Sequence, residues 1–278
     1  MQILILGSAQ DAGVPQIGCD CSNCLYARKN PKFIRLGPSI AILDNEKEYC
    51  YLIDASPDIK HQVEIIKRNV PKVKTQKTLP ISGVFLTHAH FGHVSGLWTL
   101  GKECIDTLEI TVFSSEKMGE FLVNNHPFSH MIERKNLSLS AMKINQKYPI
   151  EDFWITSFPV PHRDEYADTV GYIIERNKKI LYLPDLDCWT EDLTKLVESV
   201  DIALIDGSFY SKDELPGRDD VPHPPIKETM ELLDPTKTEI YFTHFNHTNL
   251  ILNKEGKERK EILEKGFKIA FDGLKFKI

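Results

Sequence analysis

The sequence of 278 residues lacks any apolar run near the roughly 20 residues that a membrane-spanning helix needs. It also lacks an excess of positive charge, because 34 lysines and arginines face 40 acidic residues and the net charge is −6. A nucleic-acid or anionic membrane surface is therefore not expected. The segment 1–7 has no positive residues at its start and only a short apolar run, so we expect a first strand and not a signal peptide. The expected partner is a small-molecule substrate.

Internal repeats, low-complexity tracts and Gly/Ser linkers are also lacking. The chain is long enough to bury a large core, and its 41% hydrophobic and 27% charged residues are typical of a globular protein. We therefore expect one domain over residues 1–278. A boundary near residue 150 stays open because the strand pattern restarts at Asp152, and nothing in the sequence indicates the oligomeric state.

Cysteines are few, and their spacing is not that of a secreted disulfide framework. Three of the six are clustered as Cys19, Cys21 and Cys24, and the other three are scattered. This pattern favours a cytoplasmic protein with a thiolate metal site. Thiolates select zinc or an iron–sulfur cluster, and structural zinc takes four ligands, so a histidine from elsewhere must complete the site if the metal is zinc.

Strand-like runs recur along the chain, and helical patterns separate several of them. Paired strands in some places and alternation of strand and helix in others predict an α/β sandwich of two sheets with helices outside. The expected strands are 3–6, 39–43, 49–53, 83–86, 110–113, 152–158, 170–175, 180–183, 202–205, 240–243 and 268–271. The expected helices are 57–67, 115–124, 191–199, 225–233 and 255–265.

The most informative stretch is 84–98, where three apolar residues lead directly into His88, His90 and His93. Neutral imidazole is a common ligand of zinc, iron and manganese. Two histidines at i and i+2 on a turn, with a third on the first turn of the next helix, can converge on one point beyond a strand end. A solvated loop with three unrelated histidines is the alternative, and the buried strand before it argues against that alternative.

Further candidate ligands follow other expected strands. His162 and Asp185 each come soon after a strand, and His244 and His247 follow another at a spacing of i, i+3. A lone histidine or aspartate in such a place is often structural. That several strands end in this way raises the case for a shared site. One of His244 and His247 could complete the histidine site and the other the cysteine site.

The order of H-x-H, a lone histidine, an aspartate after a strand and Thr-His resembles the metallo-β-lactamase superfamily. That resemblance implies a four-layer αββα sandwich with one or two metals at the strand ends. Within the superfamily the chain is similar to the pyrroloquinoline quinone biosynthesis protein B family, and also to the cyclic-phosphate phosphodiesterases of phosphonate degradation. The segments that carry the likeness include 5–9, 13–16, the C-x-C-x-x-C cluster, 55–59, 206–209 and 271–273.

The same resemblance implies roles for particular residues. It places His88, His90 and His162 on one metal with Asp185 bridging, and His93 and His244 on a second. His247 would close a structural zinc site with Cys19, Cys21 and Cys24. His223, between prolines, would act as an acid or orient the substrate, although a plain loop histidine is the alternative. The active-site ions would be zinc, iron or manganese.

Gly92 departs from the family pattern. Where the hydrolases have aspartate in H-x-H-x-D-H, this chain has glycine, which removes a carboxylate from the second metal. The quinone-pathway family keeps that aspartate but usually lacks the first histidines. Two alternatives therefore stay open: a site with two metal ions, and a site with a single metal ion held by three histidines and Asp185.

Three functions remain open on these residues. The first is a hydrolase of a small ester or phosphodiester, in which the metal lowers the pKa of water, Asp185 or an unliganded His93 takes the proton, and His223 lies near the leaving group. The second is an iron-dependent oxygenase or hydroxylase, which the likeness to the quinone pathway implies. The third is a non-catalytic metabolite carrier. The substrate depends on the segments 126–133 and 210–225, which we expect to be loops.

Overall fold

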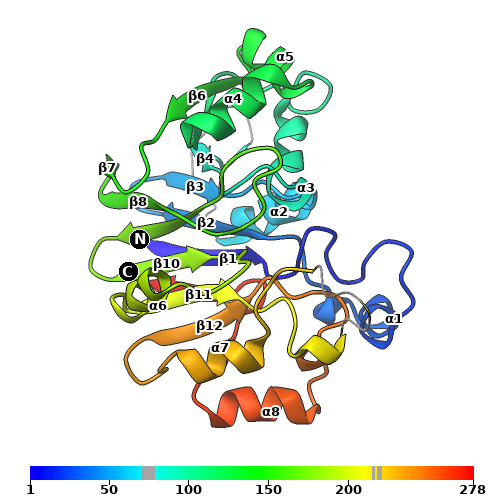
Figure 1. The fold of residues 1–278 in the computed structure, drawn as a ribbon. Coiled ribbons are helices and arrows are strands. Elements are labelled where there is room, and N and C mark those ends of the chain that lie inside the picture. The colour runs from blue at the N-terminus through cyan, green and yellow to red at the C-terminus, as the bar shows by residue number, and fades with distance from the viewer. Residues whose placement is uncertain (70–78, 215–216, 218–220) are drawn as a thin grey trace.

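The computed structural model describes residues 1–69, 79–214, 217 and 221–278. Two seven-stranded sheets lie against each other, with helices on their outer faces (Figure 1). This arrangement confirms the predicted αββα sandwich. No helix among the described residues is long and apolar enough to cross a membrane.

The first sheet contains the N-terminal strands and one strand from the C-terminus. Its order is β14 (Lys275–Lys277), β1 (Gln2–Gly7), β2 (Ser39–Asp44), β3 (Tyr49–Ile53), β4 (Gly83–Phe85), β5 (Ile110–Ser114) and β6 (Leu137–Ala141). The outer face of this sheet is covered by α2 (Ile59–Asn69), α4 (Glu116–Asn124) and α5 (Phe128–Glu133), whose buried residues share one apolar cluster with it.

The second sheet is built from the C-terminal half. Its order is β13 (Lys268–Ile269), β12 (Glu239–Thr243), β11 (Ile202–Asp206), β10 (Lys179–Leu183), β9 (Val170–Glu175), β8 (Phe153–Pro159) and β7 (Lys147–Ile150). Its outer apolar cluster includes buried residues of α6 (Glu191–Glu198), α7 (Ile226–Leu232) and α8 (Lys257–Glu264).

The inner faces of the two sheets form the central core. Alternate residues of β1 and β2 meet the large side chains of the second sheet, such as Phe153, Tyr172 and Tyr182, all of them buried. The Tyr172 hydroxyl donates a hydrogen bond of 2.7 Å to the carbonyl of Leu86, just after β4. The inward-facing residues of both sheets therefore pack against one another, and the Tyr172 hydrogen bond joins the two sheets next to the turn that carries the histidines.

Strand direction decides where the candidate ligands meet. The run β3, β4, β5 and β6 is parallel, as is the run β10, β11, β12 and β13. Because β9 is antiparallel to both β8 and β10, β8 runs in the same direction as β10. The carboxyl ends of β8, β10 and β12 consequently lie on one side of the second sheet, where ligands commonly bind in α/β folds. The carboxyl end of β4 lies on the same side, because His93 in the segment after it is 3.0 Å from Asp185 in the segment after β10.

Several elements are too short to show a period in sequence. The strands β6, β7 and β14 were not predicted, and neither was α1 (Ser22–Lys29). The segment 126–133 was predicted to be a loop, which is wrong, because α5 occupies most of it and buries Phe128 and Met131 against the first sheet. In the segment 210–225, residues 215, 216 and 218–220 lie outside the described residues; the described part contains a 3-10 turn, Lys212–Glu214.

Candidate metal centre

Each candidate ligand sits just beyond the end of a strand. His88 and His90 follow β4, His162 follows β8, Asp185 follows β10 and His244 follows β12. His93 lies in the short helix α3 (Phe91–Val94), whose N-cap position is His90. The structure thus brings together six side chains whose positions span more than half of the chain, from His88 to His244.

One cluster consists of three histidines. The Nε2 atom of His88 lies 3.0 Å from Nδ1 of His90, and that same Nδ1 lies 3.3 Å from Nε2 of His162. Nitrogens bound to one zinc ion at about 2.0–2.1 Å in tetrahedral geometry are themselves roughly 3.3 Å apart. The spacing therefore suits a shared metal ion, with His88 and His162 buried behind it.

A second cluster surrounds the carboxylate of Asp185. Its Oδ2 atom lies 3.0 Å from Nε2 of His93 and 3.2 Å from Nε2 of His244, and its Oδ1 atom lies 3.7 Å from Nε2 of His162. The Oδ2 atom and the Nε2 atoms of His93 and His244 are all buried without a hydrogen bond of acceptable geometry. Buried polar atoms left unpaired are costly. Three that converge on one point fit a cation between them.

A shell of carboxylates holds the outer nitrogens of these histidines. Asp54 lies 2.7 Å from Nδ1 of His93, and Asp187 lies 2.7 Å from Nδ1 of His162. Carboxylates in this position orient metal-binding imidazoles and select the tautomer that presents the other nitrogen to the metal. Asp54 also accepts hydrogen bonds from the backbone and hydroxyl of Thr87, so its position is set by the turn that carries His88.

Charges within the site set the protonation of the histidines. Burial and the neighbouring His93 hold the pKa of His88 well below its usual value, so the ring is neutral and can bind a metal. Burial opposes charge on His93 as well, but Asp54 and Asp185 outweigh it and raise the pKa of His93 well above its usual value. The place between Asp54 and Asp185 therefore favours a positive charge.

His223 lies at the rim of this site. Asp206 lies 2.6 Å from its Nδ1 atom, and one of its ring nitrogens is close to the ligand atoms of Asp185 and His244. Although burial disfavours its charged form, Asp206 raises the pKa of His223 to about 9. His223 therefore carries a proton at neutral pH.

His247 lies beside the cysteine cluster, where a zinc site would need its fourth ligand. The Sγ atoms of Cys19, Cys21 and Cys24 lie 3.3, 3.5 and 3.7 Å from Nδ1 of His247. Three sulfurs and one nitrogen at this spacing are the donor set of a closed structural zinc site. The arrangement connects the loop after β1 to the loop after β12, and it separates the role of His247 from that of His244.

The sequence interpretation missed the supporting carboxylates Asp54, Asp187 and Asp206. Asp54 directly follows the buried strand β3 and Asp206 is the last residue of the buried strand β11, and that local signal could have identified them. Asp54, His223 and His244 also have positive φ angles of 67°, 89° and 60°. Non-glycine residues held in this region often mark functional sites.

Asp11 is the other residue that was missed. It lies in the loop after β1, and one of its carboxylate oxygens is grouped with the ligand atoms of His93 and His244. Its Oδ1 atom is 3.8 Å from Nε2 of His93. Nothing in the local sequence signals this role, because the contact arises only from the fold.

Comparison with known proteins is consistent with this geometry. The family described as Beta-lactamase superfamily domain matches residues 49–245. Coenzyme PQQ synthesis protein B of Klebsiella pneumoniae is 30% identical over 99% of this chain and 97% of its own length. The same protein of Acinetobacter baumannii strain SDF is 29% identical over the full length of both chains.

Solved structures show the same fold. Zn²⁺-bound PqqB from Methylobacterium extorquens superposes with a TM-score of 0.84 and 28% identity, covering all of both chains. A diphosphatase from the PhnP family superposes with a TM-score of 0.72 and 22% identity, covering 99% of this chain and 96% of that one. At this identity the second likeness concerns the fold alone.

Proposed function

The chain belongs to the metallo-β-lactamase superfamily and is PqqB-like within it, and from this premise we propose that it is a metal-dependent hydrolase of a small ester or phosphodiester. The observation that carries the proposal is the convergence of five histidines on Asp185 at the strand ends, with unpaired buried atoms aimed at one another. A divalent ion bound there polarises a substrate oxygen and lowers the pKa of bound water toward about 7.

The residues around Asp185 have separate roles in this proposal. His88, His90 and His162 hold one ion, His93 and His244 hold the second, and Asp185 lies between the two groups. Asp54 and Asp187 keep His93 and His162 oriented toward the ions through hydrogen bonds of 2.7 Å.

His223 serves as the proton donor to the leaving group. Asp206 holds its Nδ1 atom, which directs the other ring nitrogen away from Asp206. Its raised pKa of about 9 keeps it protonated at neutral pH, which a general acid requires before the reaction. Asp185 accepts a proton from the attacking water.

A second function is supported by the likeness to the coenzyme PQQ synthesis proteins, at 29–30% identity over nearly the whole chain. Histidines with a carboxylate and open positions also suit ferrous iron and dioxygen. In that case the protein is an iron-dependent oxygenase, and Asp185 remains a metal ligand. The third alternative, a carrier, uses the same site without turnover.

Metal identification separates these functions. We expect protein purified without oxygen to contain zinc or manganese in the histidine site and to hydrolyse a chromogenic phosphodiester such as bis(4-nitrophenyl) phosphate. Elemental analysis and the hydrolysis rate are measured on the same sample. Iron in the site with substrate-dependent oxygen consumption and no hydrolysis would replace the hydrolase with the oxygenase. An unloaded histidine site beside a zinc-filled cysteine site would favour the carrier.

A further inference from the structure

Gly92 removes the family's carboxylate from the second metal position, and we propose that Asp11 supplies it from the loop after β1. This inference deepens the two-metal site proposed above. The carboxylate of Asp11 lies with His93 and His244, the two histidines of that position. Asp185 Oδ2 lies 3.0 Å and 3.2 Å from the same two imidazoles, so two carboxylates and two histidines face one point.

Gly92 makes this placement of Asp11 sterically possible. A Cβ atom added to Gly92 would lie 2.1 Å from Oδ1 of Asp11 and 2.4 Å from its Cα. No side chain fits at that distance, because the obstruction includes the backbone of the loop. An aspartate at position 92 and this path of the loop therefore exclude each other.

The neighbouring residue Gln10 fixes the loop in place. Its backbone N–H donates to the carbonyl of Phe245 at 3.0 Å, beside His244. Its side chain donates to the hydroxyl of Ser208 at 2.9 Å and accepts from the amide of Asn246 at 2.6 Å. These contacts hold Asp11 next to the metal position without using the Asp11 carboxylate, which keeps about half of its surface exposed, at 47%.

The atoms that Asp11 faces need a partner. The Nε2 atoms of His93 and His244 and the Oδ2 atom of Asp185 are buried and make no hydrogen bond. Asp11 Oδ1 approaches Nε2 of His93 only to 3.8 Å, too far for a hydrogen bond. A cation between these four groups satisfies all of them at once.

Manganese binding tests the role of Asp11 without any assay of activity. Manganese prefers oxygen and nitrogen donors, so zinc can be left in the thiolate site while the histidine site is loaded with manganese. We expect the wild type to bind two manganese ions and to show an electron paramagnetic resonance spectrum of a coupled pair. Asp11→Asn should lower the affinity for the second manganese ion by at least about 100-fold, the upper end of what an outer-shell residue contributes. It should also abolish the magnetic coupling between the two ions.

Two further variants make the manganese test specific. Asp20→Asn makes the same change in the same loop at an exposed carboxylate that pairs with Arg28, and should leave both ions in place. Gly92→Ala should displace the loop and lose the second ion as Asp11→Asn does. If Asp11→Asn leaves the affinity for every manganese ion unchanged, the assignment is wrong. If Asp11→Asn loses the second manganese ion but the wild type has no hydrolytic activity, the hydrolase is rejected and Asp11 remains a ligand.

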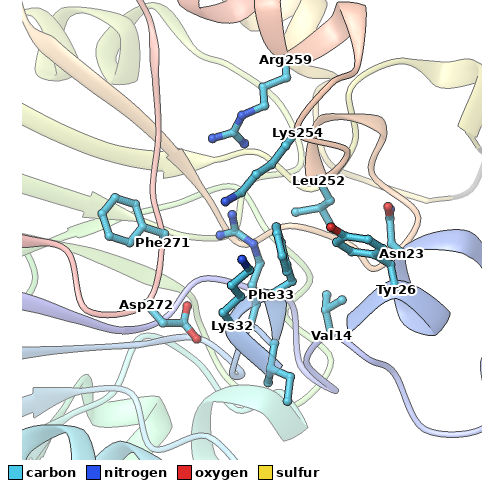
Figure 2. Close-up of a pocket in the computed structure, with 12 residues that line it drawn as sticks. Val14, Asn23, Tyr26, Lys32, Phe33, Leu252, Lys254, Arg259, Phe271 and Asp272 are labelled. Atoms are coloured by element: carbon cyan, nitrogen blue, oxygen red, sulfur yellow. The ribbon is translucent and has the colours of Figure 1, made fainter. Parts of the chain in front are cut away.

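A second inference rests on a different part of the molecule. A cavity of about 350 Å³ lies beside α1, and four cationic side chains line it, two from residues 32–35 and two from residues 254–259. We infer that this cavity binds a small anion bearing more than one negative charge, of the phosphate or diphosphate class. Figure 2 shows Lys32, Lys254 and Arg259 directed into the same space, with Phe33 and Phe271 beside them.

The charges of this cavity are unbalanced. None of its four cations, Lys32, Arg35, Lys254 and Arg259, makes an ion pair within 4.0 Å of a carboxylate among the described residues. Asp272 is the one acidic lining residue, and its two oxygens accept from the Ser8 hydroxyl and the Leu36 amide. The cavity thus carries a surplus of about three positive charges.

The cations are held in position by neutral groups. The Arg35 guanidinium donates to the Ser8 hydroxyl at 2.7 Å and to the carbonyl of Ala270 at 2.8 Å. The ammonium groups of Lys254 and Lys32 lie 4.4 and 5.4 Å from the centre of the Phe33 ring, a cation–π arrangement. Burial lowers the pKa of Arg35 to about 10, and the nearby Arg259 also opposes its charge, so an anion bound between them would be favourable. A guanidinium group can donate two parallel hydrogen bonds to two oxygens of one phosphate.

Calorimetric titration with pyrophosphate and with inorganic phosphate tests the anion site on zinc- and manganese-loaded protein. We expect pyrophosphate to bind more tightly than phosphate, and Arg259→Gln to weaken pyrophosphate at least about tenfold, the loss of one charge-assisted hydrogen bond. Lys260→Gln removes an exposed cation from the same helix outside the cavity and should not change the affinity. If Arg259→Gln does not change the affinity for pyrophosphate, the pyrophosphate binds at the metal centre and the proposed anion site is wrong. The proposal is also wrong if the wild type binds no pyrophosphate.

Discussion

We expect His88→Ala to reduce hydrolysis by at least about 10³-fold while the protein stays folded. Electrostatic stabilisation by a bound metal contributes several kcal/mol, and each 1.36 kcal/mol corresponds to about tenfold in rate. His88 is buried, and its Nε2 atom and that of His162 both lie next to Nδ1 of His90. Its removal therefore opens the first metal position directly, and His90→Ala should have the same effect. Turnover and metal content are measured together.

The control for His88→Ala is His130→Ala, the same substitution at an exposed histidine of α5 that pairs with Glu133 outside the centre. It should retain full activity. The melting temperature of each variant, followed by circular dichroism, reports whether the fold survives. Full activity of either His88→Ala or His90→Ala at wild-type metal loading would show that the three-histidine cluster is not the catalytic centre.

We expect Cys19→Ser to abolish zinc binding at the cysteine site and to lower the melting temperature by roughly 10 °C or more. Zinc binding to such sites contributes directly to folding stability, and for a chain of this size each kcal/mol corresponds to about 2–4 °C. The site joins the loop after β1 to the loop after β12, so its loss frees two segments that also carry Asp11 and His244. Zinc content and thermal unfolding are measured on the same preparation.

Cys104→Ser provides the matched control for the zinc prediction. Cys104 is an exposed free cysteine that belongs to none of the metal clusters of the described residues. It should unfold at the wild-type temperature with its zinc retained. Chelation that melts the wild type while Cys19→Ser stays as stable as the wild type would mean that stability comes from the histidine site and not from the cysteine site.

Long, strongly apolar strands were predictable because their pattern is local. The bounds 49–53 and 170–175 were predicted as the structure has them, and the other predicted strands were close. The missed elements are short or lie at sheet edges: β14 has three residues, and β7 contains Pro149. Their strand conformation depends on the neighbour they pair with, which the local sequence does not contain.

The ligands were predictable for a related reason. A histidine or aspartate that follows a buried strand lies at the end of the sheet, so the residue type and its place in sequence suffice to name His88, His162, Asp185 and His244 as candidate ligands. The supporting contacts of Asp187 and Asp11 depend on loop paths. Asp187 contacts His162, which is 25 residues away in the sequence, and Asp11 approaches His93, which is much farther away in the sequence.

The sequence by itself determined the two-sheet sandwich, the residues able to bind metal and the division between a thiolate site and a histidine site, because apolar period and donor chemistry are properties of single residues and their neighbours. Only the tertiary structure shows which carboxylates contact the imidazoles and that the carboxylate of Asp11 lies beside Gly92, at the position where the resemblance expects an aspartate. The physical reason is steric: whether Asp11 can reach the second metal position depends on the close approach of two backbones, and that approach exists only in the folded chain.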